Sequence, residues 1–361
     1  MQNLNKDLFV LGTPLQLLNA IEARHHFGDR PSSLALLHWG WPASAFDSLL
    51  GEMEWQEIVW VPMAAQRPAW RYPMLGPDAS SHLNEYVWTY QQYRRRRRLE
   101  AALARFGRVD RLVVGNLLGD HMRHAIGCIP HAELMAVDDG TDTLRVAALR
   151  RNPSKVPEEP PPAGLIKSVK QSIRQRCEWD CVQPEAVTFF TACDIEIGPS
   201  DRLIRNDYRW LRGRAAGGGR TNQVYFLGQP LIEDGYVKES TYLHYLQRAI
   251  RYFGGKPVVY IPHKRESTRT VALIERELGL ATVHFGGPIE VVLALGSELP
   301  DMLASFFCSA LENCSILFGN SLEVVAFHLP PHVLICGPEP VEGIYEYFRR
   351  RQTETFQVLE V

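Results

Sequence analysis

Residues 133–140 read ELMAVDDG, and this stretch says more about the chain than any other. The run 133–137 has the length and apolar character of a buried strand. It ends in two carboxylates and a glycine, Asp138-Asp139-Gly140. Open α/β sheets bind ligands at the carboxyl ends of their strands, so the pattern places an acid where a general base would lie. An ordinary turn with an Asp cap and a glycine at positive φ is the alternative interpretation.

A second strand, in the other half of the chain, runs into a cluster of charges. Residues 256–266 read KPVVYIPHKRE, so His263, Lys264 and two further ionisable residues follow the apolar run. This cluster suits a negatively charged leaving group. His263 alone is equally compatible with a turn. One half of the chain has an acidic strand end and the other half a basic one. This division favours two nucleotide-binding halves that contribute different groups to one reaction.

Strands and helices alternate in the first half of the chain. Residues 8–11 form an apolar strand, Gly12-Thr13-Pro14 makes a turn, and 15–23 has helical periodicity with proline at its start. Comparable strands are expected at 33–38, 57–62, 111–117, 133–137 and 188–192. This order predicts a doubly wound, mostly parallel sheet.

The second half repeats the pattern after a glycine-rich stretch at 215–220, where we expect the hinge between domains. Strands are expected at 224–227, 258–261, 282–285, 315–318 and 333–336, and helices at 241–253, 271–278 and 299–311. The chain is therefore predicted to be α/β, with one domain over 1–214 and another over 221–361.

Composition narrows the class of protein. A chain of 361 residues with 45% hydrophobic residues has the size of two domains. Its net charge of −2 gives no global attraction to nucleic acid. Seven cysteines without regular spacing are typical of a reducing compartment. The polar start and the lack of an 18-residue apolar run predict a cytoplasmic protein.

Four motifs together resemble the bacterial sialyltransferases of the lipooligosaccharide and polysialic-acid type, which are GT-B enzymes related to glycosyltransferase family 52. The motifs are the turn 12–16, the triplet Asp138-Asp139-Gly140, the segment 260–266 and Gly319-Asn320-Ser321. The commonly described histidine motif is His followed by Pro. Here Pro262 precedes His263, an order that suits the lipooligosaccharide branch better.

The resemblance implies two Rossmann-like domains facing a central cleft, the first binding the acceptor and carrying the base, the second binding the CMP-sugar. It implies an inverting transfer of sialic acid, or a related nonulosonic acid, from its CMP donor to a cell-surface glycan. In that family the acidic motif supplies the base and the histidine motif holds the donor phosphate.

These roles are assigned to individual residues as follows. Asp138 is the expected base, and Asp139 competes for that role because neighbouring carboxylates split their pKa values. His263 is the expected phosphate ligand or acid. The other expected donor contacts are Gly12, Thr13, Gly140, Pro262, Lys264, Asn320 and Ser321. Ser321 is expected at a helix N-terminus, where a plain N-cap is the alternative.

No cofactor or metal is expected, since a CMP donor carries one phosphate that basic side chains can neutralise. His121 and His124 lie one turn apart, near Asn116, but no carboxylate is in frame to complete a metal site. Two alternatives remain open for the activity: another CMP-activated acid sugar (legionaminic, pseudaminic or 3-deoxy-octulosonic acid), or a non-catalytic component of a capsule assembly complex.

The expected partners are the CMP-sugar donor and a glycan or glycolipid acceptor, without nucleic acid. The segment 165–176 is a basic amphipathic helix by its periodicity. It is compatible with peripheral contact at the inner membrane and with packing on the domain. The arginine run 94–98 goes all round a helix and therefore gives no single recognition face.

Overall fold

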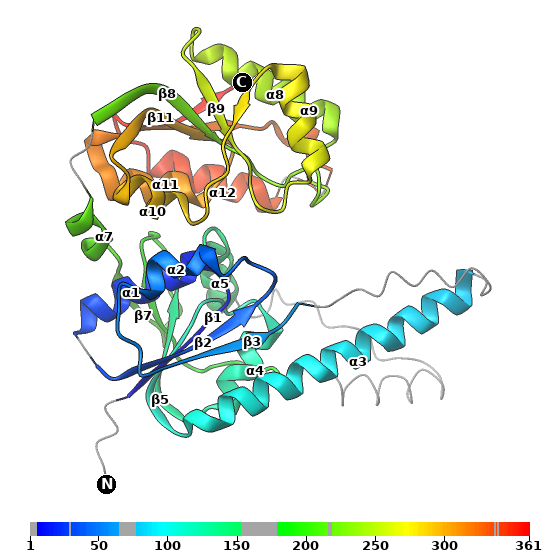
Figure 1. The fold of residues 1–361 in the computed structure, drawn as a ribbon, viewed down its shortest axis with the longest axis vertical. Helices are drawn as coiled ribbons and strands as arrows, with labels where there is room; N and C mark the ends of the chain where they lie inside the picture. Colours follow the sequence, from blue (N-terminus) through cyan, green and yellow to red (C-terminus); the bar gives the residue numbers. More distant parts are fainter. Residues whose placement is uncertain are drawn as a thin grey trace. The chain divides into compact units, whose positions relative to one another are not determined.

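The computed structural model describes residues 6–28, 30–64, 77–152, 179–215, 219–335, 337 and 339–361, with only the backbone at 77–87 and 339–340. The segment 165–176 lies outside the described residues. The chain divides into two compact units, Met1–Asn206 and Asp207–Val361 (Figure 1). Within the described ranges, no helix is both long enough and apolar enough to cross a bilayer.

The first unit is built on a parallel sheet of seven strands, in the order β3-β2-β1-β4-β5-β6-β7. Every neighbouring pair is parallel. The strands are β1 Asp7–Leu11, β2 Ser32–His38, β3 Glu57–Pro62, β4 Val109–Val114, β5 His131–Val137, β6 Thr188–Thr191 and β7 Arg202–Arg205. The doubly wound sheet predicted from the sequence is thus confirmed, although β4 ends before the predicted residue 117.

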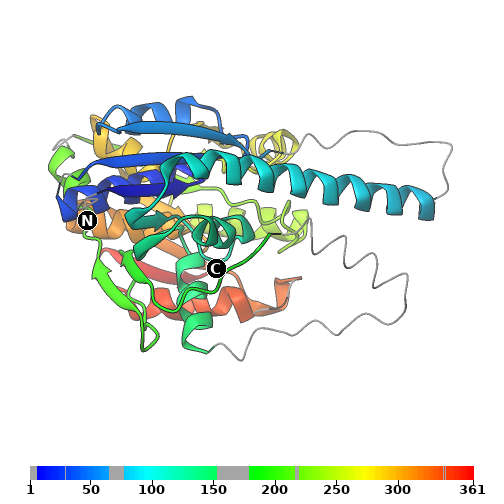
Figure 2. The same ribbon diagram turned by 90° about the horizontal axis from the view of Figure 1, so that it is seen from below.

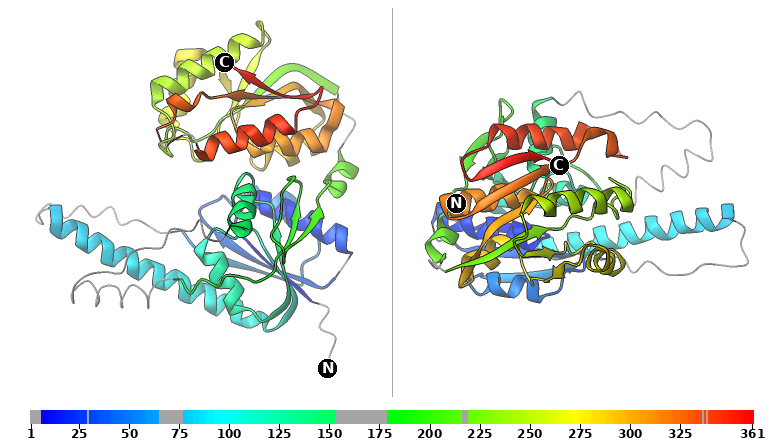
Figure 3. Two further views of the ribbon diagram at one scale, coloured as in Figure 1. Left: turned by 180° about the vertical axis from the view of Figure 1, so that it is seen from behind. Right: turned by 90° about the horizontal axis from the view of Figure 1, so that it is seen from above.

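Helices cover both faces of this sheet. They are α1 Pro14–Phe27, α2 Ser44–Leu50, α3 Pro77–Leu103, α4 Asp120–Cys128 and α5 Asp142–Arg151, with a 3₁₀ turn η1 at Ala104–Phe106. Right-handed crossovers put α1 and α2 on one face and α3 and α4 on the other (Figure 1). The long helix α3 extends past the edge of the sheet (Figures 2 and 3).

The second unit is built on a parallel sheet of six strands, in the order β10-β9-β8-β11-β12-β13. The strands are β8 Gly219–Leu227, β9 Val258–Ile261, β10 Ala281–Thr282, β11 Glu298–Ser305, β12 Glu323–His328 and β13 Phe356–Glu360. The helices are α7 Arg209–Arg214, α8 Glu239–Tyr252, α9 Thr268–Leu278, α10 Ile289–Leu295, α11 Ser309–Phe318 and α12 Glu339–Arg350, with 3₁₀ turns η3 Gly319–Ser321 and η4 Pro331–Val333. Helices α8 and α9 cover one face, and α10, α11 and α12 the other (Figure 1).

Several sequence predictions for this unit are wrong. The predicted helix 299–311 is strand β11 followed by the start of α11, and the predicted strand 315–318 is the last turn of α11. The helix expected to begin at Ser321 is wrong, because β12 follows there at Glu323–His328. In the predicted strand 333–336, Val333 is the last residue of η4, residues 334 and 335 belong to no strand, and residue 336 is outside the described residues. Buried parallel strands are apolar on both faces, so their sequences lack the alternation that separates strands from helices.

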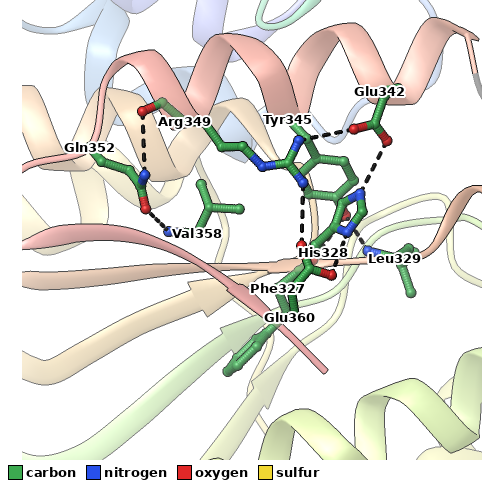
Figure 4. A network of polar contacts seen from close by, with 9 residues as sticks. All are labelled: Phe327, His328, Leu329, Glu342, Tyr345, Arg349, Gln352, Val358 and Glu360. Carbon is green, nitrogen blue, oxygen red and sulfur yellow. Dashed lines mark hydrogen bonds and ion pairs between the residues drawn. The ribbon is translucent and has the colours of Figure 1, made fainter.

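Polar contacts hold the last strand against α12 (Figure 4). His328, at the end of β12, contacts Glu360 of β13 through Nδ1 at 2.7 Å and Glu342 of α12 through Nε2 at 3.1 Å. Arg349 donates to both carboxylates, at 2.9 and 3.3 Å. The network therefore joins β12, β13 and α12 at the carboxyl edge of the second sheet.

Candidate functional site

The order of strands in the first unit reverses between β1 and β4, and this switch point is where doubly wound sheets bind ligands. Gly12 follows β1, and its N–H donates to Gln16 Oε1 at 2.6 Å. Gly115 follows β4, and a Cβ there would overlap the Gln16 side chain. Thr13 caps α1 by accepting from the Gln16 N–H through its hydroxyl at 3.2 Å. The predicted residues Gly12 and Thr13 therefore do lie at this edge.

Asp138 is a buried residue, only 2% exposed. One carboxylate oxygen accepts from the Thr191 hydroxyl and the other from the Ala192 N–H at 2.7 Å. Burial raises the pKa of Asp138 to about 6, while these hydrogen bonds act in the opposite direction. The carboxylate thus joins β5 to β6, and its oxygens are engaged inside the unit.

Asp139 has a different environment. It is half-buried and lines a small pocket together with Asn116, Asp142 and Thr143. Its Oδ2 accepts from Asn116 Nδ2 at 2.5 Å, and its backbone N–H donates to the Thr143 hydroxyl at 3.3 Å. Gly140 follows with φ of 70°, the conformation that a tight turn out of the strand requires. Of the two carboxylates, Asp139 is the one at the pocket.

Two aromatic rings and an arginine lie near the start of α4. The His121 and Trp39 rings meet edge to face with centroids 4.9 Å apart, and the Arg95 guanidinium lies 5.5 Å from the Trp39 ring centre. Burial lowers the pKa of His121 to about 4. His121 is therefore neutral at pH 7, a hydrogen-bonding group and not a cation.

His124 lies beside the same Trp179 ring as His121, with centroid distances of 5.5 Å for His124 and 6.3 Å for His121. Its Nδ1 accepts from the Asp180 N–H at 3.1 Å, and its Nε2 lies 3.2 Å from Glu100 Oε1. The two histidines that the sequence places one turn apart thus share an aromatic neighbour, while the ring nitrogens of His124 contact Asp180 and Glu100. Within the described residues, no group of three or more metal-ligating side chains is found.

In the second unit, His263 lies in the turn after β9, at the carboxyl edge of the sheet. It is half-buried, whereas Lys264 and Arg265 beside it are exposed, and Pro262 precedes it. The Arg265 N–H donates to His263 Nδ1 at 3.2 Å, so the ring proton is on Nε2. Burial, followed by the neighbouring Arg265 and Lys264, lowers the pKa of His263 to about 4. The predicted basic turn therefore contains one neutral hydrogen-bond donor, the His263 ring, and two positively charged side chains, Lys264 and Arg265.

The second switch point lies between β8 and β11. Gln229, just after β8, accepts through Oε1 from the Phe307 N–H at 3.0 Å and from the Ser305 hydroxyl at 3.3 Å. The sequence does not predict Ser305 and Phe307 as part of this edge, because they lie in the predicted helix 299–311. The dipeptide Gly228-Gln229 after an apolar strand was the signal available in the sequence.

Asn320 and Ser321 are not where the sequence placed them. They form η3 after α11 and precede β12, so they lie at the amino edge of the sheet, opposite the His263 turn. Arg220, near the amino end of β8, donates to the Ser321 carbonyl at 2.6 Å. No helix begins at Ser321, and the expected phosphate site at a helix N-terminus there is wrong.

No protein-family model matches the chain, and no curated protein matches it. Among solved structures, the S. aureus MnaA–UDP co-structure is similar, with 12% identity, a TM-score of 0.50, and coverage of 99% of this chain and 84% of that chain. The Methanocaldococcus jannaschii UDP-GlcNAc 2-epimerase with UDP-GlcNAc and UDP has 12% identity, coverage of 98% and 89%, and a TM-score of 0.49. The calicheamicin glycosyltransferase CalG4 has 13% identity, coverage of 99% and 86%, and a TM-score of 0.49.

Such low identities show the fold alone. The MnaA structure is matched over nearly the whole of this chain. Each unit has a parallel, doubly wound sheet with helices on both faces. The protein therefore has two Rossmann-like domains of the GT-B type, as the sequence predicts. That their edges face a cleft stays a prediction.

Proposed function

We propose that the protein is an inverting glycosyltransferase that moves sialic acid, or a related nonulosonic acid, from its CMP donor to a glycan or glycolipid acceptor. The observation that carries this proposal is the placement of Asp139. A half-buried carboxylate lines a pocket at the carboxyl edge of a doubly wound sheet, with an amide donor fixed beside it. This is the arrangement that a general base requires.

Asp139, and not Asp138, is the base in this proposal. The acceptor hydroxyl gives its proton to the Asp139 carboxylate while its oxygen forms a bond to the anomeric carbon of the donor sugar. The bond from that carbon to the CMP phosphate oxygen breaks, and CMP leaves with the bonding electron pair. Asn116 orients the carboxylate through the hydrogen bond to Oδ2. Asp138 supports the loop from within, since both of its oxygens are engaged by β6 and the residue that follows it.

The second domain receives the CMP phosphate. His263 supplies a neutral Nε2–H donor, and the exposed Lys264 adds positive charge. A single phosphate carries little enough charge for these groups to stabilise it as it leaves. Pro262 fixes the start of the turn, and Gly12, Thr13 and Gly140 are proposed to contact the substrates at the edge of the first sheet.

The fold is compatible with this activity, since a structure with bound UDP shares it. Cytoplasmic location and peripheral contact with the inner membrane belong to the same proposal, because lipid-linked glycan acceptors are made at that surface. The same site would serve another CMP-activated acid sugar. A non-catalytic component of a capsule assembly complex has no need for a carboxylate in a pocket.

Nucleotide binding to the purified protein tests the choice of donor. Titration calorimetry with CMP, UDP and AMP should show the tightest binding for CMP. The control variant Asn320→Ala should bind CMP as the wild type does, since Asn320 lies at the opposite edge of the sheet from His263. Tighter binding of UDP than of CMP would contradict the CMP donor. It would still be compatible with an enzyme that uses a different nucleotide-sugar.

A further inference from the structure

Glu266 is a buried carboxylate in a turn that is otherwise rich in exposed charges. It is 9% exposed, whereas Lys264 and Arg265 beside it are open to solvent. Its Oε2 accepts from the His263 backbone N–H at 2.6 Å, and its Oε1 accepts from the Tyr260 hydroxyl at 2.5 Å. The Tyr260 and Tyr242 hydroxyls are 2.8 Å apart. Both oxygens of Glu266 are thus used inside the domain, and the residue does not itself meet a ligand.

The neighbouring strand has a glycine where this carboxylate lies. A Cβ on Gly228 would overlap Glu266 Oε2 and the Tyr260 hydroxyl. The Gly228 N–H donates to the Ile261 carbonyl at 2.8 Å, which keeps the two strand ends together. Gly228 therefore leaves the space that Glu266 occupies, at the switch point where the sheet would bind a nucleotide.

The turn that Glu266 holds also fixes the state of the His263 ring. Glu266 accepts from the backbone N–H of His263, and the Arg265 N–H donates to Nδ1 of the same ring. The ring is neutral at pH 7 because burial lowers its pKa to about 4. A neutral ring that accepts at Nδ1 can only donate at Nε2. The turn therefore determines which ring atom is a donor and where it lies.

We infer that Glu266 is a positioning residue, which acts through His263 by holding its backbone so that the ring offers Nε2–H to the phosphate of the nucleotide. This rests on the proposed function for the identity of the ligand. The arrangement of Glu266, Gly228 and the two tyrosines is independent of it. An acceptor at Oε2 is the essential feature, and a full charge is not, since burial raises the pKa of Glu266 to about 7.

Three variants and CMP as the probe test this inference. Glu266→Met removes the acceptor, and we expect CMP to bind at least about tenfold more weakly, as for a lost hydrogen bond to a charged group. Glu266→Gln keeps an acceptor for the His263 N–H and should bind CMP within about threefold of the wild type. Glu277→Gln, on the exposed side of α9, is the matched control and should change nothing.

A double-mutant cycle separates positioning from plain stabilisation. In a His263→Ala background, Glu266→Met should weaken CMP binding no further, because its effect passes through His263. An equal loss in both backgrounds would overturn the inference. If Glu266→Met does not fold by circular dichroism, Glu266→Asp replaces it, since the shorter side chain withdraws the acceptor from the His263 N–H. For Glu266→Asp we again expect weaker CMP binding in the wild-type background alone, and an equal loss in both backgrounds would overturn the inference.

Nitrogen NMR of the His263 ring decides the inference without any ligand. The wild type at pH 7 should show a neutral ring protonated on Nε2, and Glu266→Met or Glu266→Asp should show a mixture of tautomers. A charged ring in the wild type, or an unchanged tautomer in both variants, would overturn it. Should the wild type fail to bind CMP, the proposed donor is wrong, and the NMR result alone decides the role of Glu266.

Discussion

The two adjacent aspartates show what a sequence predicts of a site and what it does not. The triplet after an apolar run predicted the carboxyl edge of the sheet, and β5 ends there. Which carboxylate lies inside depends on β6, whose Thr191 and following residue Ala192 engage Asp138. Those partners are more than fifty positions away along the chain, so nothing local in the sequence distinguishes Asp138 from Asp139.

The first prediction concerns the division of roles between these aspartates. Asp139→Asn should lower sugar transfer by at least ~100-fold, the usual scale for losing a general base. Asp138→Asn should lower it by less than ~10-fold, since it alters only internal hydrogen bonds. Initial rates of CMP release, with circular dichroism as a check on folding, measure both. The reverse order would return the base to Asp138, the residue expected from the sequence.

A second prediction follows from the pKa of Asp138, which burial raises to about 6 from an ordinary value of 3.8. A carboxyl with a raised pKa favours the folded state when protonated, so its contribution is present below about pH 4 and is lost as the pH rises through 6. Asp138→Asn removes this titration. The free energy of unfolding of the variant, relative to wild type, should rise by up to about 3 kcal/mol between pH 4 and pH 8. A difference that does not change with pH would mean that Asp138 is charged throughout.

At the scale of elements, the sequence predicts strands and helices well where turn-forming residues mark their ends. Thr13 and Pro14 predicted the start of α1, where Thr13 caps the helix and Pro14 occupies its first turn. Prediction failed for β11 and β12, whose apolar residues do not distinguish a strand from a helix. Leu299, Met302 and Leu303 have helical spacing, and only pairing with β8 and β12 makes them a strand. Tertiary contacts determine whether such segments form strands or helices, and local sequence patterns do not reveal those contacts.

Gly228 gives a prediction at this scale. Gly228→Ala should lower the free energy of unfolding by roughly 1–3 kcal/mol, because the added methyl group overlaps Glu266 and Tyr260 at the end of β8. Gly286→Ala is the control, since a Cβ there meets nothing within 4 Å. Urea denaturation of both variants measures the difference. Equal stability of the two variants would show that the carboxylate has room to move aside.

At the scale of the whole molecule, the sequence predicted two α/β units but placed their boundary too late. The glycine-rich stretch 215–220 suggested a hinge, whereas the units divide between Asn206 and Asp207. Helix α7 belongs to the second unit because it buries Trp210 and Leu211 and packs on α10 and α11. Composition shows where a chain can bend, but packing decides which unit a helix joins.

Metal dependence is also a property of the whole enzyme. We expect sugar transfer to continue in excess EDTA, since the single phosphate of a CMP donor is matched by His263 and Lys264. Rates with and without EDTA, followed by addition of magnesium or manganese, give the measurement. Loss of activity in EDTA that either metal restores would contradict this expectation.

The central claim is that Asp139 acts as the base in transfer from a CMP-activated acid sugar. Release of CMP is the most direct measurement, with purified wild type and Asp139→Asn offered sialic, legionaminic, pseudaminic and 3-deoxy-octulosonic donors, and UDP-sugars as the comparison. The account predicts that the wild type releases CMP from at least one of the four, and that Asp139→Asn does so at least ~100-fold more slowly. Turnover of a UDP-sugar with no release of CMP from any donor would contradict it.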